Sequence, residues 1–219
     1  KDRGMASAIS FLNHVIRVKD LENVLGICAS TGDTSAAAAL YLSYLPKSKV
    51  KTVVLLPKGK VTAQQLSQPL GSGATVIELP GVFDDCMRIV EQLAQEYKVF
   101  LLNSKNPVRI LGQKSYAYEI AQQMRWDTEG LVVVVPIGNA GNVTAVMEGF
   151  LDLFALGIIK ELPSILGVQS YHADPIVRWR ETGSFSPVKV TPSVAQAAMI
   201  GDPVSFPKVN RLVTDQYGD

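Results

Sequence analysis

The sequence predicts an α/β fold in which short parallel strands alternate with helices. Runs of β-branched or apolar residues recur along the 219-residue chain, and alanine-rich or amphipathic segments separate them. This rhythm is typical of a parallel sheet that carries helices on both faces. Such sheets have their functional loops at the carboxyl ends of the strands, so chemistry is expected at the strand-to-helix junctions.

Each element follows from its local pattern. The first strand is an apolar run, the fifth contains four consecutive valines, and the helix after the first strand contains four consecutive alanines. Short β-branched runs suit buried strands, whereas longer segments with spaced apolar residues suit helices. The predicted strands are residues 24–29, 52–56, 75–79, 99–102, 131–135 and 165–169, and the predicted helices are residues 34–45, 62–71, 83–97, 107–125 and 142–156.

Two α/β units are expected. The long helical segment 107–125 is followed by the polar sequence of residues 127–130, which predicts a boundary between a unit of residues 1–126 and a unit of residues 127–219. After Asp174 the periodicity weakens, and prolines interrupt the pattern. Because proline ends helices and strands, short helices and loops are expected there.

Composition excludes several classes of function. The 21 basic and 20 acidic residues leave a formal charge of +1, without the basic patch that nucleic acids or anionic membranes require. The longest apolar runs are much shorter than the ~20 residues of a bilayer span. The two cysteines, Cys28 and Cys86, are expected to be buried free thiols in the reducing cytoplasm. No cluster of histidines and cysteines has metal-ligand spacing, so no metal is expected.

The junction after the first predicted strand offers groups that bind anions. Its residues are Ser30, Thr31, Gly32, Asp33 and Thr34, at the start of a helix. Hydroxyls, backbone amides and the helix dipole favour an anion there. Because serine, threonine and aspartate are also preferred N-caps, helix capping without any bound anion would explain the same residues. Asp33 would repel an anion, so it is expected to face a donor or to cap the helix.

The junction after the fifth predicted strand is rich in glycine. Glycine lets the backbone approach a phosphate closely, and successive amides can form an anion nest. The spacing matches neither the Walker pattern nor the dinucleotide fingerprint, and a tight turn would explain it as well. The residues are Gly138, Asn139, Ala140, Gly141 and Asn142.

A third junction and the first residue complete the candidates. Asn103 and Ser104 follow the fourth predicted strand and are expected to be exposed at its edge, and Arg109 offers a planar fork for phosphate or carboxylate. Pro107 also fits a simple helix start. Lys1 is a nucleophile candidate, although an isolated lysine is normally a solvated charge.

The histidines offer two weaker candidates. His172 follows the sixth predicted strand, where it could line a cleft, and His14 lies in a helical stretch with an expected structural role.

Several of these motifs, in this order, resemble threonine synthase. This family belongs to the fold type II, tryptophan synthase β-like group of pyridoxal phosphate-dependent enzymes. The resemblance covers essentially the whole chain and implies two parallel-sheet α/β units with the site between them. It rests on residues 1–5, 30–34, 55–61, 103–104 with Arg109 and Gln113, 138–142 and 200–203.

The resemblance implies a role for each candidate. Lys1 would form the Schiff base with pyridoxal 5'-phosphate and shuttle protons, and residues 138–142 would hold the cofactor phosphate. Asp33 would lie near the ring hydroxyl of the cofactor, where many relatives have asparagine. Ser30, Thr31 and Thr34 would bind the substrate carboxylate or nearby oxygens, while Asn103, Ser104 and Arg109 would bind the substrate phosphate.

The implied reaction converts O-phospho-L-homoserine and water to L-threonine and phosphate. A related enzyme that adds a sulfur nucleophile to O-phosphoserine, as in cysteate synthase, is one alternative. A serine or threonine dehydratase is another. The resemblance also implies a cytoplasmic enzyme that forms a homodimer and takes a small phosphorylated amino acid.

The chain departs from the family pattern at both ends. It begins at the lysine, and it ends at Asp219, before the late hydroxyl residue that contacts the pyridine nitrogen in the family. The N-terminal unit is therefore expected to be incomplete at its start and the C-terminal unit at its end. A truncated inactive module is the non-enzyme alternative.

Overall fold

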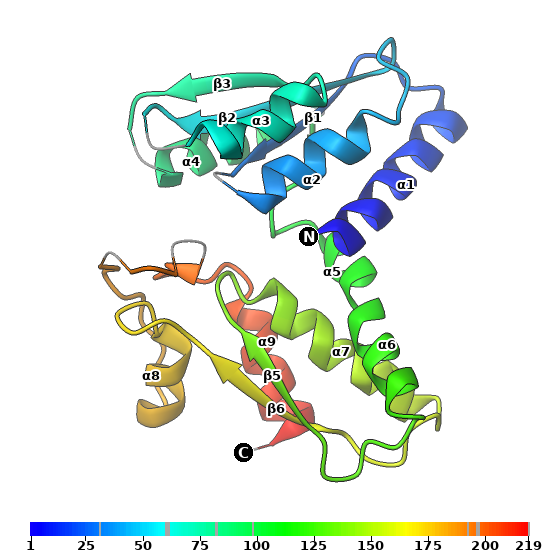
Figure 1. Cartoon of the computed structure of the whole chain (residues 1–219), viewed down its shortest axis with the longest axis vertical. Helices are drawn as coiled ribbons and strands as arrows, with labels where there is room; N and C mark the ends of the chain where they lie inside the picture. Colours follow the sequence, from blue (N-terminus) through cyan, green and yellow to red (C-terminus); the bar gives the residue numbers. More distant parts are fainter. Residues whose placement is uncertain are drawn as a thin grey trace. The chain divides into compact units, whose positions relative to one another are not determined.

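The structure, a computed structural model, describes residues 1–30, 32–59, 62–81, 83–97, 99–191, 193–195 and 198–218. The chain forms two compact units, Lys1–Gly112 and Gln113–Asp219, which are described separately (Figure 1). The two compact units meet between Gly112 and Gln113, whereas the sequence predicts a domain boundary after residue 126. That domain boundary stays a prediction.

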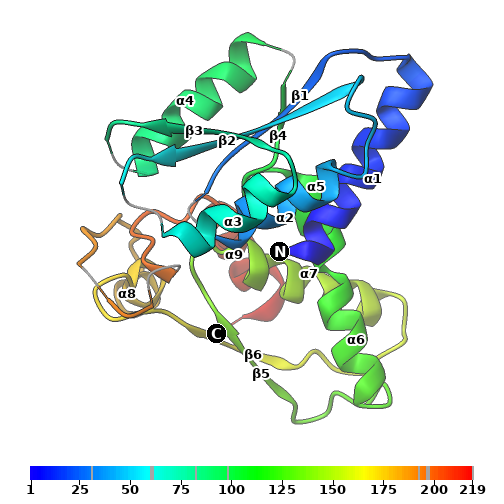
Figure 2. The ribbon, with the colours of Figure 1, turned by 45° about the horizontal axis from the view of Figure 1, so that its top comes forward.

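Unit 1 contains a parallel four-stranded sheet in the order β3-β2-β1-β4 (Figure 2). The strands are β1 (Val24–Ala29), β2 (Val50–Pro57), β3 (Thr75–Leu79) and β4 (Val99–Leu101). Val24 pairs with Val50 of β2, and Leu25 pairs with Val99 of β4. All four predicted strands of this unit are confirmed.

Helices cover both faces of the unit 1 sheet. Because side chains alternate along a strand, Cys28 of β1 packs with Met5 and Ala38 on one face, whereas Ile27 packs with Val90 on the other. Burial of each Ile or Met side chain of this kind stabilises the fold by about 2 kcal/mol. The helices are α1 (Asp2–Lys19), α2 (Asp33–Leu42), α3 (Ala63–Gly71), α4 (Phe83–Glu96) and α5 (Pro107–Gln113).

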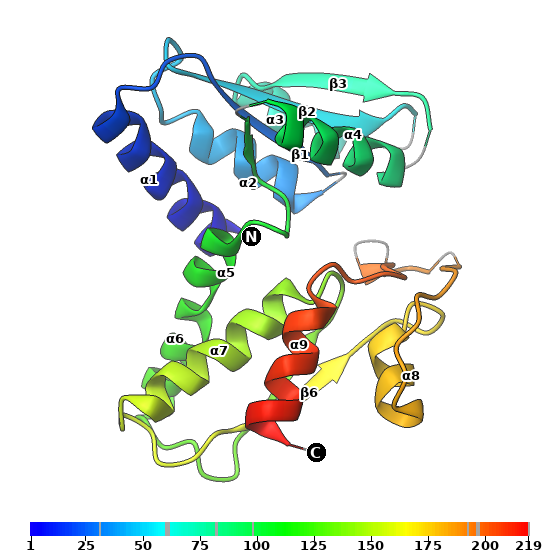
Figure 3. The ribbon, with the colours of Figure 1, turned by 180° about the vertical axis from the view of Figure 1, so that it is seen from behind.

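Unit 2 is built on a parallel pair of strands, β5 (Val132–Pro136) and β6 (Ser164–Val168). Its helices are α6 (Ser115–Gln123), α7 (Gly141–Ala155), α8 (Pro175–Thr182), α9 (Phe206–Leu212) and the π-helix η2 (Val213–Tyr217). Helices α7 and α9 lie side by side (Figure 3). Within the described residues one face of this sheet is solvent-facing, because Val132 and Val134 are 56% and 60% exposed. The prediction that helices cover both faces of the sheet is therefore confirmed for unit 1 but not for the described part of unit 2.

The predicted helix 107–125 is interrupted. Lys114 separates α5 from α6, and the two halves pack in different units. Within unit 1, a Cβ added at Gly112 would lie 2.5 Å from the Arg3 carbonyl oxygen, so α5 lies directly against the backbone of α1. Within unit 2, α6 packs against α7. The periodicity of one helix could not reveal that its halves have different partners.

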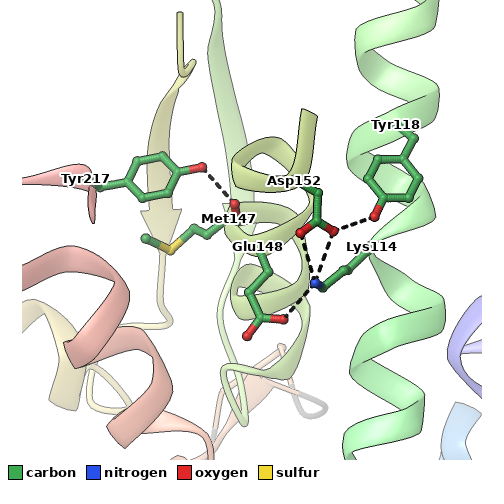
Figure 4. A network of polar contacts seen from close by, with 6 residues as sticks. All are labelled: Lys114, Tyr118, Met147, Glu148, Asp152 and Tyr217. Atoms are coloured by element: carbon green, nitrogen blue, oxygen red, sulfur yellow. Dashed lines mark hydrogen bonds and ion pairs between the residues drawn. The ribbon is translucent and has the colours of Figure 1, made fainter. Parts of the chain in front are cut away.

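A polar network joins α6 to α7 (Figure 4). Lys114 Nζ lies 3.0 Å from Asp152 Oδ2 and 3.5 Å from Glu148 Oε2. The Tyr118 hydroxyl donates to Asp152 Oδ2 at 2.6 Å, and burial together with the Asp152 and Glu148 charges raises the pKa of Tyr118. Figure 4 also shows the Tyr217 hydroxyl, which donates to the Met147 carbonyl at 3.0 Å.

No helix in the described part of the chain is long and apolar enough to cross a membrane. The described residues also contain no group of three or more His, Cys, Asp or Glu side chains that could hold a metal ion.

Candidate active site

The loop between β1 and α2 carries four described candidates, and Thr31 lies outside the described residues. Gly32 is the N-cap of α2 and has no side chain that could cap the helix, and among the described residues Asp33 makes no capping bond. Capping by Asp33 is therefore not what the structure shows, and this exposed carboxylate begins the first helical turn. The Gly32 amide instead donates to Ser30 Oγ at 3.2 Å, while Thr34 is half-buried.

Lys1 lies in unit 1 immediately before α1. Its carbonyl accepts a hydrogen bond from the Met5 amide at 3.0 Å. Lys1 is an exposed residue, but partial burial of its side chain and the positive charge of Arg109 lower the pKa of the amine, and the Asp33 carboxylate opposes this shift. Unit 1 thus brings together three of the predicted residues. A lowered pKa increases the neutral fraction of the amine, which is the form that attacks a carbonyl carbon.

Arg109, the predicted planar fork, is buried within unit 1. The residue is 2% exposed, and its Nη1 donates to the Leu102 carbonyl at 2.8 Å. Burial lowers the pKa of Arg109. Burial also raises the pKa of the adjacent Cys28 to about 12, against the opposing effect of the Arg109 charge. Cys28 and Cys86 are both buried free thiols, as predicted.

The prediction that Asn103 is exposed at the strand end is wrong. The residue is 5% exposed, and its amide bonds to both backbone groups of Ala29. These backbone groups lie beyond the last backbone rung between β1 and β4, so a buried side chain satisfies them. Ser104, the next residue, is half-buried.

In unit 2, residues 138–140 lie between β5 and α7, and Gly141 and Asn142 begin α7. Ala140 has φ 62° and ψ 0°, and it is the N-cap of α7. Its carbonyl accepts from Thr144 Oγ1 at 2.7 Å, and the Asn139 carbonyl accepts from the Ser205 amide at 3.2 Å. These bonds fix the carbonyls of the loop.

The backbone amides of this loop have no hydrogen-bond acceptor among the residues that the structure describes. Within the described ranges, the backbone N–H groups of residues 138–143 have no protein acceptor. A methyl group at Gly141 would lie 3.9 Å from Ser205 Oγ, so the protein leaves space over this residue. A left-handed residue beside free amides at a helix N-terminus fits a phosphate group.

Sequence reasoning missed two side chains that cap the starts of helices. Asn106 Oδ1 accepts from the Val108 amide at 2.9 Å, a capping bond that the Asn-Pro dipeptide could have signalled. Gln169 Oε1 accepts from the Ile176 amide at 2.9 Å and from the Val177 amide at 3.1 Å, at the start of α8. No local pattern marks a cap that comes from outside the helix and its flanking residues.

The two histidines are both exposed. His14 lies in α1, as its helical pattern predicts. His172 follows β6 with φ 62°, and its ring centroid is 4.0 Å from that of Tyr171. A role for His172 in lining a cleft stays a prediction.

Comparison with known proteins adds to this geometry. The family model described as pyridoxal-phosphate dependent enzyme matches residues 1–219. Threonine synthase from Methanocaldococcus jannaschii is 42% identical over 210 residues, which are 95% of this chain and 49% of that protein. Threonine synthase 2, chloroplastic, from Arabidopsis thaliana is 37% identical over 210 residues, which are 94% of this chain and 40% of that protein.

Two solved structures have a fold similar to that of this chain. The crystal structure of threonine synthase from Escherichia coli matches with a TM-score of 0.76 at 26% identity, over 97% of this chain and 50% of that one. Maize serine racemase matches with a TM-score of 0.75 at 20% identity, over 97% and 60%, and shows the fold alone. The chain spans about half the length of the curated relatives it matches. With a family model that matches from end to end, the chain belongs to the pyridoxal-phosphate dependent enzyme family.

Proposed function

We propose that this protein converts O-phospho-L-homoserine and water to L-threonine and phosphate, with pyridoxal 5'-phosphate as its cofactor. The observation that carries the proposal is the position of Lys1 at the start of α1, where Arg109 and Asp33 act on its amine and partial burial together with the Arg109 charge lowers its pKa. The names of relatives that are 37–42% identical support the choice of reaction. When bound, the cofactor supplies an electron sink for charge that develops on the substrate carbon.

Lys1 and the loop of residues 138–142 would hold the cofactor. The neutral Lys1 amine would hold the cofactor at its aldehyde carbon, with the aldehyde oxygen released as water, and Nζ would afterwards carry protons. The free amides of Gly138 to Asn142 would donate to the cofactor phosphate, where the positive end of α7 adds to the attraction. Asp33 would accept from the ring hydroxyl, and its negative charge partly restores the pKa of Lys1.

The two loops of unit 1 would hold the substrate. Ser30, Thr31 and Thr34 would donate to the substrate carboxylate or nearby oxygens. Ser104 and Arg109 would bind the substrate phosphate. Arg109 is already positioned by its bond to the Leu102 carbonyl. A fixed, buried guanidinium favours a phosphorylated substrate over free serine or threonine.

Product analysis of the complete gene product tests the reaction. With O-phosphohomoserine and added cofactor, we expect equal amounts of L-threonine and phosphate. Formation of a sulfonated or thiolated product from O-phosphoserine and a sulfur nucleophile would instead establish the cysteate synthase-like alternative. Ammonia and a keto acid from free serine or threonine would establish a dehydratase, and no turnover of any of these substrates would favour an inactive module.

A variant of Arg109 tests the substrate site. Arg109→Ala removes the only side chain in this proposal that is always positively charged, so KM for the phosphorylated substrate should rise by a factor of about 100. Lys105→Ala is the matched control, because Lys105 is a neighbouring cation whose ammonium pairs with Glu91 at 2.7 Å. An unchanged KM in the Arg109 variant would rule out this assignment.

We also propose a cytoplasmic homodimer. Two buried free thiols support a reducing compartment. The homodimer rests on the resemblance to threonine synthase, and light scattering of the complete gene product would test it.

A further inference from the structure

Asn103 continues the sheet of unit 1 with its side chain. The last backbone rung between β4 and β1 is the bond from the Leu102 amide to the Ile27 carbonyl, at 2.9 Å. The next rung belongs to Asn103. Its Nδ2 donates to the Ala29 carbonyl at 2.6 Å, and its Oδ1 accepts from the Ala29 amide at 3.0 Å. The Asn103 carboxamide therefore makes the two hydrogen bonds to Ala29 that the backbone N–H and C=O of a neighbouring strand would otherwise make.

This rung stands between two functional loops. Ala29 is the last residue of β1 and immediately precedes Ser30. Asn103 immediately precedes Ser104. The pair of bonds therefore holds the first residues of the β1–α2 loop against the first residues of the β4–α5 loop. Both loops are proposed above to bind different parts of one substrate.

Neighbouring side chains brace the β4–α5 loop internally. Asn106 Nδ2 donates to the Leu101 carbonyl at 2.7 Å, and Arg109 Nη1 donates to the Leu102 carbonyl at 2.8 Å. Both of these bonds join residues within the segment 101–109. The bonds of Asn103 instead join two residues that are 74 positions apart in the sequence.

We propose that Asn103 is a positioning residue that fixes the β1–α2 loop relative to the β4–α5 loop, rather than a principal ligand of the substrate phosphate. The inference rests on the proposed function for the purpose of the two loops. The Asn103 carboxamide is buried, and its oxygen and one of its N–H groups bond to Ala29. These bonds limit the number of hydrogen bonds that the carboxamide can make to a phosphate.

Two variants and a matched control test this inference in the complete gene product. Asn103→Asp keeps an acceptor for the Ala29 amide but places a carboxylate oxygen against the Ala29 carbonyl, and Asn103→Ala removes both bonds. Asn106→Asp is the control, because it loses only the bond to the Leu101 carbonyl, which lies within the same segment, and keeps the acceptor for Val108. If the alanine variant does not fold, the aspartate variant still gives the result.

Hydrogen exchange is the first measurement. Amides of residues 29–34 should exchange about tenfold faster in both Asn103 variants, the factor expected for loss of a buried hydrogen bond, and should be unchanged in Asn106→Asp. Unchanged exchange in the Asn103 variants would overturn the inference. This measurement needs no turnover, so it stands even if the proposed reaction is wrong.

Kinetics separate positioning from direct phosphate binding. With positioning, KM for O-phosphohomoserine rises by about tenfold, whereas the inhibition constant of inorganic phosphate stays within about threefold of the unmodified enzyme. A parallel rise of about tenfold or more in both constants would make Asn103 a phosphate ligand and contradict the inference.

Discussion

At the scale of single residues, partial burial of the Lys1 side chain and the charges around it set how readily its amine reacts. Burial and Arg109 lower the Lys1 pKa, and Asp33 raises it. The two charged neighbours thus act in opposite directions on one amine. A site that forms a Schiff base gains from the first effect, because the neutral amine is the nucleophile.

Replacement of Asp33 should therefore shift the reaction of Lys1 with the cofactor to lower pH. In Asp33→Asn the Lys1 pKa falls further, so the neutral fraction of the amine increases at any pH below that pKa. The measurement is the pH dependence of cofactor attachment, followed by borohydride reduction and peptide mass spectrometry. Asp20→Asn is the control, because Asp20 is an exposed aspartate at the other end of α1. A shift to higher pH would contradict the electrostatic account.

Cys28 should be inert in the folded protein. Its pKa of about 12 leaves almost no thiolate at neutral pH, and the side chain is fully buried. Iodoacetamide at pH 8 should label it only after denaturant is added. Rapid labelling of Cys28 under native conditions would mean that β1 opens or that the thiol is exposed.

At the scale of elements, α6 and α7 are held together by close backbone approach and by the Lys114 network. A Cβ at Gly149 would lie 2.7 Å from Ala117 Cβ and 2.8 Å from the Lys114 carbonyl oxygen. Helix α7, which contains Gly149, begins within residues 138–142. The packing of α7 against α6 therefore sets where the amides of those residues lie.

Gly149→Ala should destabilise the protein despite the higher helix propensity of alanine. Propensity favours alanine by about 1 kcal/mol, but overpacking at this crossing should cost about 1–3 kcal/mol. Urea unfolding gives the net change. Gly71→Ala is the matched control, because a methyl group at this helical glycine meets nothing within 4 Å. Equal stabilisation in both variants would show that α6 can move away without cost.

The Lys114 network should contribute modestly to stability. The Lys114 side chain is 16% exposed and that of Asp152 is 40% exposed, so solvent screens the pair in part. A double-mutant cycle with Lys114→Met and Asp152→Asn should give a coupling free energy of about 1 kcal/mol. A coupling near zero would mean that Glu148 and water replace Asp152 as partners of Lys114.

At the scale of the whole molecule, the parallel architecture and the junction loops could be predicted because they depend on local pattern. Strands β1 and β3 have the predicted bounds, and the loop of residues 138–142 begins a helix as expected. The burial of Asn103 could not be predicted, because its partner Ala29 is distant in the sequence. The break at Lys114 depends on packing in two separate units, which one helical periodicity does not record.

The most direct test of the account locates the cofactor on the chain. The complete gene product is mixed with pyridoxal 5'-phosphate, reduced with borohydride and digested, and the modified peptide is identified by mass spectrometry. We predict one pyridoxyl group on the ε-nitrogen of Lys1. Modification of another lysine, scattered labelling or no labelling would contradict the assignment of Lys1 as the residue that binds the cofactor.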